Sequence, residues 1–336
     1  MRTIILPGGE TDLEQDFVNR RNDGAKETMF FVRKKHLRII YTVDKLSESY
    51  LAASQELFDV NRFEKIRRAL LADNLMSRKF WVRSEPVKEE DLLRIHTPAY
   101  LKKLRSSGYL AQALHLDYIS PWDSDLLEYF MYQTGGTVQA ADLAYSTRGI
   151  VANLGGGFHH AFPEQARGFC LLNDIAIAIQ HLRVYHKNLR IMVVDLDFHQ
   201  GDGVAVIFKD DQEVFTFSIH AENWREIASD TNFDLVLPPE IGDESYLNAL
   251  SEELGPVAAK FQPEMVVYLA GADVHRDDPL GNFGLSDQGV LDRDIFVYQL
   301  AKKYEAPLVA VAGGGYGMTA WRLYYHFLKW ILQKGK

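Results

Sequence analysis

The sequence contains a single cysteine, Cys170, among its 336 residues. One thiol excludes a disulfide framework within the chain and any zinc site that is built from several cysteines. Such sparing use of cysteine is typical of a reducing compartment, so we expect a cytoplasmic location.

Long apolar runs and an excess of basic residues are missing as well. No window holds the ~18 uninterrupted apolar residues that a membrane span needs. The first apolar run, 4–6, stops at Pro7 and is too short for the core of a signal peptide. The net charge of -9 argues against a nucleic-acid-binding protein. We therefore expect no membrane span and no direct nucleic-acid partner. Hydrophobic residues still make up 47% of the chain, which excludes a disordered protein.

Strand-like and helix-like segments alternate from about residue 38 onward. Short apolar or β-branched runs predict buried parallel strands over 149–154, 190–196, 214–219, 265–269 and 307–311. Capping residues and helical apolar spacing predict helices over 99–105, 175–184, 296–304 and 319–332. This alternation predicts an α/β fold in one domain, 38–336, with a mainly parallel central sheet and helices on both faces. The polar residues 1–37 are expected to form an N-terminal extension packed on that domain.

Each predicted strand ends in a reactive or glycine-rich segment. The segments cover residues 155–160, 195–203, 218–220, 271–273 and 313–317. Ligands of open α/β sheets bind outside the carboxyl ends of the strands. The sequence therefore predicts one site that all five ends share.

Two carboxylates and an imidazole in these segments have the chemistry of a metal site. Asp197 and His199 alternate along an extended stretch and therefore share one side, and Asp273 at another strand end supplies a third ligand. Three protein ligands leave a position open for water and substrate, as in catalytic sites. An Asp-x-His pattern alone is more often a turn cluster. The tandem histidines His159 and His160 at a neighbouring strand end favour the metal, for which zinc, iron(II) and manganese all fit the donor set.

Three further groups have acid–base or hydrogen-bonding chemistry. His159 and His160 follow three glycines, and a histidine near a metal can act as a general base. Asp195 and Asp202 are candidate carboxylate partners that would fix the histidine tautomers. Tyr316 lies between glycines, where it is either a core anchor or an oxyanion donor; the glycine setting favours the donor.

From about Arg38 to its end, the sequence resembles the histone deacetylase family of the arginase/deacetylase superfamily. The segments that carry the resemblance are 155–161, 168–170 with Asn173-Asp174, 194–203, 271–273 and 313–317. The segment 133–137, the segment from Asp278 to Asp294 and the pair His199-Gln200 look most like class IV and its bacterial relatives.

The resemblance implies an arginase/deacetylase-like catalytic domain over 38–336 with zinc-dependent hydrolase activity. The enzyme would remove acetyl or longer acyl groups from the lysine side chains of proteins or peptides, or from small acylated amines. The implied zinc ligands are Asp197, His199 and Asp273. His160 matches the proton acceptor and His159 its electrostatic neighbour, with Asp195 and Asp202 as their partners.

The resemblance also assigns residues around this centre. Tyr316 matches the tyrosine that polarises the substrate carbonyl, and Gly168 and Phe169 match the wall of an acyl-lysine tunnel. A structural site for a monovalent cation, potassium, is implied by the following groups: Asp195, the hydroxyl of Ser218, and the backbone oxygens of Asp197, His199 and Ile219.

Several alternatives stay open. An acetylpolyamine or other small-molecule amidohydrolase would use the same metal centre. A two-metal arginase-like enzyme ranks lower because the segment 155–160 offers no carboxylate. A non-enzymatic acyl-lysine binding protein would need neither base nor oxyanion donor. Trp224 either lines the tunnel mouth or is an exposed loop aromatic, and Asp117 and Asp123 lie in the region where many family members have a substrate-gripping aspartate.

Overall fold

The computed structural model describes residues 37–42, 59, 61–77, 80–119, 125–281 and 283–334. The chain divides between Lys34 and Lys35 into two units, and every described residue belongs to the second. The predicted extension, 1–37, therefore lies outside the described residues except for Leu37, and so does Asp123.

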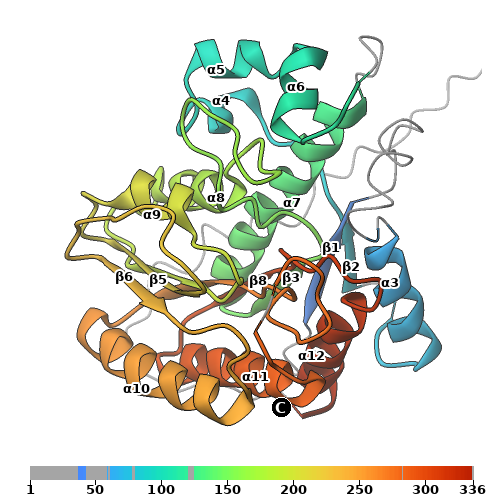
Figure 1. Cartoon of the computed structure of the whole chain (residues 1–336), viewed down its shortest axis with the longest axis vertical. Coiled ribbons are helices and arrows are strands. Elements are labelled where there is room, and N and C mark those ends of the chain that lie inside the picture. Colours follow the sequence, from blue (N-terminus) through green and yellow to red (C-terminus); the bar gives the residue numbers. More distant parts are fainter. Residues whose placement is uncertain are drawn as a thin grey trace, which may run out of the picture. The chain divides into compact units, whose positions relative to one another are not determined.

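A single parallel sheet forms the centre of the described chain (Figure 1). Its strands are β1 (Arg38–Tyr41), β2 (Trp81–Arg83), β3 (Ile150–Asn153), β4 (Ile191–Asp195), β5 (Val214–His220), β6 (Asn232–Val236), β7 (Met265–Leu269) and β8 (Leu308–Val311). They lie in the order β2-β1-β3-β8-β7-β4-β5-β6, and every neighbouring pair is parallel.

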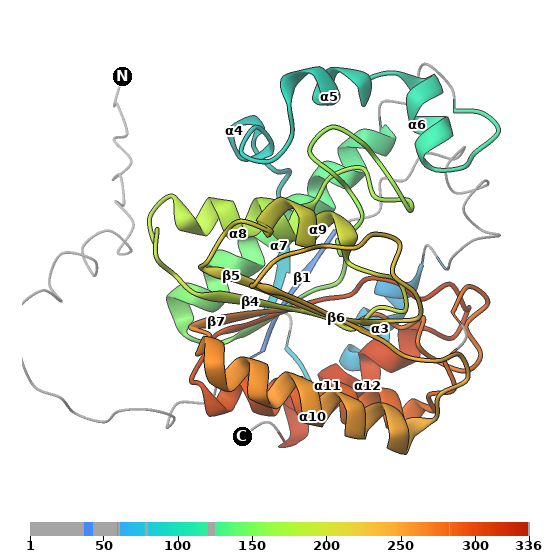
Figure 2. The same ribbon diagram turned by 60° about the vertical axis from the view of Figure 1, so that its left-hand side comes forward.

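Helices cover both faces of this sheet, which confirms the predicted α/β class. The helices are α3 (Arg62–Ala72), α4 (Glu89–Leu92), α5 (Pro98–Lys103), α6 (Ser107–Ala113), α7 (Asp125–Thr147), α8 (Asp174–Arg183), α9 (Asp202–Phe208), α10 (Asp243–Phe261), α11 (Asp287–Lys303) and α12 (Trp321–Lys334). Figure 2 shows α7, α8 and α9 on one face and α10, α11 and α12 on the other. No helix among the described residues is both long enough and apolar enough to cross a membrane.

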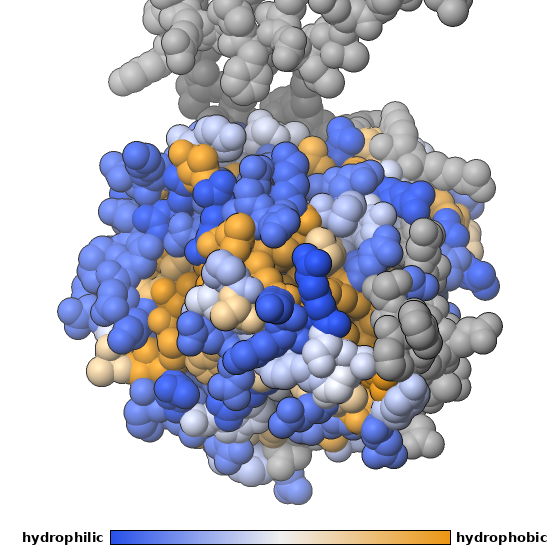
Figure 3. All heavy atoms as spheres, turned by 90° about the horizontal axis from the view of Figure 1, so that it is seen from above, coloured by the Kyte–Doolittle hydropathy of each residue, from blue (hydrophilic) through white to orange (hydrophobic). Residues whose placement is uncertain are grey.

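Alternating side chains of the strands fill two hydrophobic cores. Val193 points into the core that contains Ile179 of α8, whereas its neighbour Val194 packs in the core that contains Leu250 of α10 and Phe327 of α12. Both faces are buried, which is why the central strands are apolar along most of their length. Seen from above in Figure 3, the outer surface is mainly hydrophilic, with smaller hydrophobic areas between the polar side chains.

The five predicted strands are confirmed as β3, β4, β5, β7 and β8. The helices predicted near 99–105, 175–184, 296–304 and 319–332 are confirmed as α5, α8, α11 and α12, although α11 begins at Asp287, nine residues before the predicted start. The five strands are neighbours in the order β3-β8-β7-β4-β5. Their carboxyl ends therefore lie side by side and bring the five reactive segments to one edge of the sheet.

A histidine between three helices makes stability depend on pH. His181 of α8 lies 3.2 Å from Asp142 of α7 and 2.9 Å from Asp91 of α4. Hydrogen bonds to Asp142 and Asp91 outweigh burial and raise the pKa of His181 to about 9. Because the folded-state pKa exceeds the unfolded one, this stabilisation is complete below about pH 6.5 and is lost as the pH rises through 9.

We expect wild type to exceed the variant His181→Gln in free energy of unfolding by about 1–2 kcal/mol at pH 6. Urea unfolding of both proteins between pH 6 and pH 10 measures this difference, which should shrink toward the alkaline end. A difference that stays constant or grows with pH would contradict the assignment.

Candidate active site

Three of the predicted residues converge beyond the ends of β4 and β7. One donor atom from each of Asp197, His199 and Asp273 lies within 4.8 Å of the other two. The Nδ1 atom of His199 is 3.1 Å from Asp197 Oδ1 and 3.1 Å from Asp273 Oδ2. Both carboxylates are almost completely buried. This group has the ligand types and the spacing of a site for a divalent cation.

Backbone N–H groups hold the two carboxylates in place. Asp197 Oδ1 accepts the N–H of His199 at 2.9 Å, and Asp273 Oδ1 accepts the N–H of Phe198 at 3.0 Å. The N–H of Asp197 itself donates to Asp195 Oδ1 at 3.1 Å. The loop after β4 therefore fixes ligands that come from two different strands.

The electrostatic field at this point favours positive charge. Burial and the charge of Asp197 raise the pKa of Asp273 to about 6. Burial lowers the pKa of His199, but Asp197 and Asp273 together outweigh it and raise the value to about 11. A cation placed among these three groups would relieve the repulsion between the carboxylates.

The tandem histidines each contact one of the predicted carboxylates. His159 Nδ1 donates to Asp195 Oδ2 at 2.7 Å, and His160 Nδ1 donates to Asp202 Oδ1 at 2.9 Å. Burial lowers the pKa of His159, but Asp195 and Asp197 raise it to about 9. Burial and the neighbouring positive charges hold the pKa of His160 well below its usual range. The two rings, 3.9 Å apart between centroids, thus differ in charge at neutral pH.

A buried carboxylate on α8 shapes the glycine turn before these histidines. Gly156 and Gly157 have φ values of 73° and 78°, which only glycine adopts without strain. Asp174 accepts the N–H groups of Gly157 and Phe158 at 3.0 and 2.7 Å, and Gln133 Oε1 accepts that of Gly156 at 3.0 Å. The segment 133–137 of α7 therefore helps to hold the histidine loop.

Tyr316 is held by its backbone in the loop after β8. Its N–H donates to Asp278 Oδ2 at 2.7 Å. The Tyr316 ring lies 6.3 Å from the Phe169 ring and 6.4 Å from the His199 ring, measured between centroids. Burial and the charges of Asp197 and Asp273 raise the pKa of Tyr316 well above 10, so the hydroxyl stays a hydrogen-bond donor.

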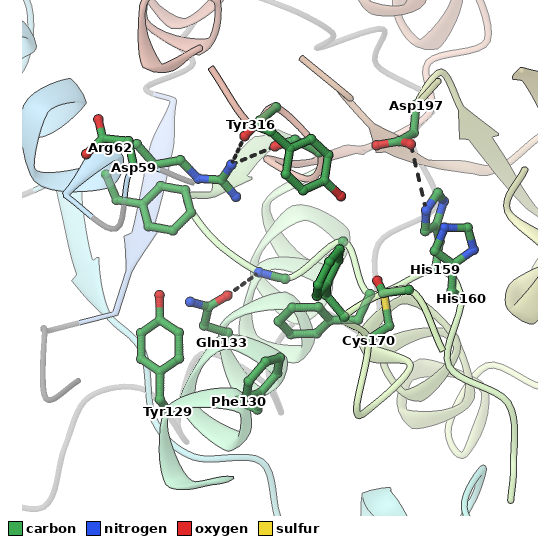
Figure 4. Close-up of a pocket in the computed structure, with 18 residues that line it drawn as sticks. Asp59, Arg62, Tyr129, Phe130, Gln133, His159, His160, Cys170, Asp197 and Tyr316 are labelled. Carbon is green, nitrogen blue, oxygen red and sulfur yellow. Dashed lines mark hydrogen bonds and ion pairs between the residues drawn. The ribbon is translucent and has the colours of Figure 1, made fainter. Parts of the chain in front are cut away.

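A cavity of about 90 Å³ is lined by His159, His160, Asp197 and Tyr316. Figure 4 shows His159, His160 and Asp197 on one side of it, Arg62 and Asp59 on the opposite side, and the Tyr316 hydroxyl pointing toward the histidines. Gly168 and Phe169, the predicted tunnel wall, also line it.

Sequence reasoning missed five of the lining residues. They are Asp59, Arg62, Phe63, Tyr129 and Phe130. Arg62 of α3 donates to the backbone oxygens of Gly314 at 2.6 Å and Gly315 at 2.9 Å and so supports the loop of Tyr316. The sequence signals only an amphipathic helix here.

The turn that carries Gly168 touches His160 directly. Gly168 has φ 53°, and a Cβ atom there would lie 2.4 Å from His160 Cδ2. We expect Gly168→Ala to displace the imidazole. Under the proton-transfer role that is proposed for His160 below, this should reduce kcat about 100-fold, since misplacing a reacting group by 1 Å costs about that much. Steady-state kinetics measures the loss. Gly255→Ala in α10, where an added Cβ meets nothing within 4 Å, is the matched control. Equal rates for both variants would contradict this contact.

The structure places the remaining predicted residues as follows. Asp195 and Ser218 are paired across β4 and β5, and the Ser218 hydroxyl lies 2.7 Å from His220 Nδ1. Ile219, the next residue of β5, is fully buried. Trp224 stacks on His160 with ring centroids 4.6 Å apart, so it is more than an exposed loop aromatic.

Comparison with known proteins decides the family. A model of the histone deacetylase domain matches residues 56–328. The chain belongs to the histone deacetylase family. It is 34% identical to an uncharacterized protein of Picosynechococcus, over 80% of this chain and 89% of that protein. It is 32% identical to histone deacetylase 2 of Arabidopsis thaliana, over 79% of this chain and 71% of that protein.

Bacterial relatives agree with this assignment. The acetoin utilization protein AcuC of Staphylococcus aureus (strain MSSA476) is 30% identical, over 83% of this chain and 77% of that protein. The resemblance seen in the sequence is thereby confirmed, and membership in the histone deacetylase family makes the chain a deacetylase, an enzyme that hydrolyses amides. The likeness to class IV stays a prediction.

A buried arginine ties the two ligand-bearing loops together. Arg293 of α11 donates to the backbone oxygens of Leu196 at 2.9 Å and Gly271 at 2.7 Å, next to the loops of Asp197 and Asp273. It also pairs with Asp294 at 2.7 Å. Arg293 is only 1% exposed, so its loss removes the cation that pairs with the buried Asp294, which keeps its bond from Tyr268, and leaves the two carbonyls without this donor.

We expect Arg293→Met to lower the free energy of unfolding by about 3–5 kcal/mol. Denaturant unfolding followed by circular dichroism measures this loss. The control is Arg68→Met. Arg68 is an exposed partner of Glu64, so this substitution should change the free energy of unfolding by less than about 1 kcal/mol. Similar stability losses in both variants would contradict the assigned contacts.

Proposed function

We propose that the chain is a zinc-dependent lysine deacylase of the cytoplasm, which removes acetyl or longer acyl groups by means of activated water. The main observation behind the proposal is that residues from distant segments of the chain meet at one place. Asp197, His160 and Tyr316 come from three different segments and line one cavity. Behind them, His199 and Asp273 complete the cluster with Asp197, and Asp202 holds His160. The substrate in this proposal is an acyl-lysine side chain of a protein or peptide, or a small acylated amine.

The donor set fits a divalent ion. Two carboxylates offset its charge, and the imidazole of His199 favours a transition metal such as zinc, with iron(II) or manganese as substitutes. A bound ion of this kind would act as a Lewis acid on the substrate carbonyl and on water. Asp195 and Ser218, with the backbone oxygens of Asp197, His199 and Ile219, would hold a structural potassium ion.

The chain's own residues carry the remaining steps of the proposed mechanism. With Nδ1 bound to Asp202, His160 has its Nε2 atom free to accept a proton from the attacking water and then to pass it to the departing lysine amine. The positively charged His159 stabilises the negative charge that develops nearby. Tyr316 donates its hydroxyl hydrogen to the oxyanion. Gly168 and Phe169 pack along the acyl-lysine chain.

Metal removal tests this proposal. The purified protein is assayed on lysine peptides that carry acyl groups from acetyl to long-chain and on acetylated polyamines. We expect hydrolysis to disappear after treatment with a chelator and to return with zinc, because Asp197, His199 and Asp273 would release and rebind the ion. Activity that survives complete metal removal would contradict the mechanism. Exclusive activity on polyamines would favour the small-molecule alternative.

A further inference from the structure

The side chain of Arg167, which has no role in the proposed mechanism, contacts two of the groups that border His160, Asp202 and Trp224. Arg167 Nη1 donates to Asp202 Oδ2 at 2.6 Å, while the other oxygen of Asp202 accepts from His160. The Arg167 guanidinium also lies 4.6 Å from the centroid of the Trp224 ring. Trp224 in turn stacks on His160 with an interplanar angle of 23°. The four side chains form a closed ring of contacts.

The backbone of Arg167 is fixed by a tight turn. Its N–H and its carbonyl bond to Cys170 at 3.2 and 2.8 Å, and the two residues between them, Gly168 and Phe169, both have positive φ values. This is the geometry of a two-residue turn of type I′. The arginine side chain therefore extends from a rigid base beside the His160 ring.

The loop of Trp224 has a separate anchor. Gln200 is fully buried, and its amide donates to the backbone oxygen of Arg225 at 2.8 Å and accepts the N–H of Arg225 at 2.9 Å. The backbone next to Trp224 thus stays in place when Arg167 is changed. Loss of the guanidinium would release the side chains of Trp224 and Asp202 without unfolding the loop.

We propose that Arg167 is a positioning residue for hydrolysis, whose guanidinium holds Asp202 and Trp224 where both orient the imidazole of His160. The inference rests on the proposed function, in which His160 transfers the proton. A planar guanidinium can pair with a carboxylate and stack on an indole at the same time, which a lysine ammonium cannot do in this geometry. Arg167 is about one-third exposed, so its replacement leaves the hydrophobic cores intact.

Kinetics of matched variants test this role. We expect Arg167→Met to lower kcat about 10–100-fold with little change in KM, as is typical when the partner of a catalytic histidine is disturbed. Arg167→Lys should recover only part of the loss, and added guanidinium ion should raise kcat of Arg167→Gly. Arg225→Met is the control, because this neighbouring arginine lies over Phe162 instead. An unchanged kcat in Arg167→Met, or an equal loss in Arg225→Met, overturns the proposal.

Fluorescence separates positioning from a general loss of structure. Acrylamide quenching of Trp224 is obtained as the difference between each protein and its Trp224→Phe counterpart. Quenching should increase in Arg167→Met, where one face of the indole is uncovered, and stay unchanged in Arg225→Met. Unchanged quenching in Arg167→Met, or a kcat loss that merely follows a lower folded fraction or metal content, overturns the proposal.

The same experiments distinguish this inference from the proposed function. A wild-type protein without chelator-sensitive hydrolysis would refute the proposed function and with it the kinetic role of Arg167. The quenching difference would still decide whether Arg167 holds Trp224. Active wild type with kcat unchanged in Arg167→Met would refute the inference alone.

Discussion

Tyr316→Phe is expected to lower kcat about 10²–10³-fold, the usual loss when one well-placed oxyanion donor is removed. The substitution deletes a single hydroxyl. The loop keeps its bond to Asp278, which uses the backbone N–H of residue 316, and the ring keeps its neighbours Phe169 and His199. Fold and metal content should therefore match wild type. Steady-state kinetics on an acyl-lysine peptide gives kcat, with metal analysis and thermal melting alongside.

Tyr324→Phe is the matched control for this experiment. The Tyr324 hydroxyl donates to the backbone oxygen of Gly313 in the same loop, and the residue is buried on α12. Its loss leaves a carbonyl without a partner and should cost stability, about 1–3 kcal/mol, with a much smaller effect on kcat. Near-normal turnover of Tyr316→Phe, or equal kcat losses in both variants, would reject the oxyanion role.

Asp273→Asn is expected to abolish metal retention and hydrolysis while it stabilises the metal-free protein. The change removes one of two buried carboxylates that repel each other. Because the pKa of Asp273 is raised to about 6, its ionisation opposes folding above that pH, and the stabilising effect should vanish below about pH 4. Thermal melting in chelator and in zinc measures both effects. Wild type should gain Tm with zinc, and Asp273→Asn should not.

Asp211→Asn is the control for the loss of a carboxylate in general. Asp211 pairs with Arg183 and does not border the cavity. This variant should bind metal and hydrolyse substrate like wild type. Full metal content in Asp273→Asn, or a lower Tm of this variant in chelator at neutral pH, would contradict the assignment of Asp273 as a ligand.

The parts of the sheet that could be predicted from the sequence are strands with both faces buried. The strands β3, β4, β5, β7 and β8 are buried on both faces and therefore mostly apolar, whereas the edge strands β2 and β6 are partly exposed and gave no signal. The long helix α7 was missed because Gly135 and Gly136 lower helix propensity. Gly135 is required by a contact with a segment distant in sequence, because a Cβ at this position would lie 1.9 Å from the backbone oxygen of Glu85.

The site residues that could be predicted are those that come directly after the strands in the sequence. Asp197, His199 and Asp273 were grouped correctly in space because their strands are neighbours, although their roles remain to be tested. Arg62 could not be found in this way. It reaches the cavity from a helix more than 250 positions away from the carbonyls that it contacts. Nothing in its local sequence separates it from the surface arginines of the same helix.

The position of β8 in the sheet constrains the order of folding. This strand is the last of the described chain, yet it lies between β3 and β7 and forms the only described pairing between the two halves of the sheet. Until it docks, each half exposes an unpaired central edge that is open to association with other chains. The catalytic pocket therefore cannot assemble during synthesis of the first 300 or so residues, and chains truncated before Leu308 should aggregate rather than fold.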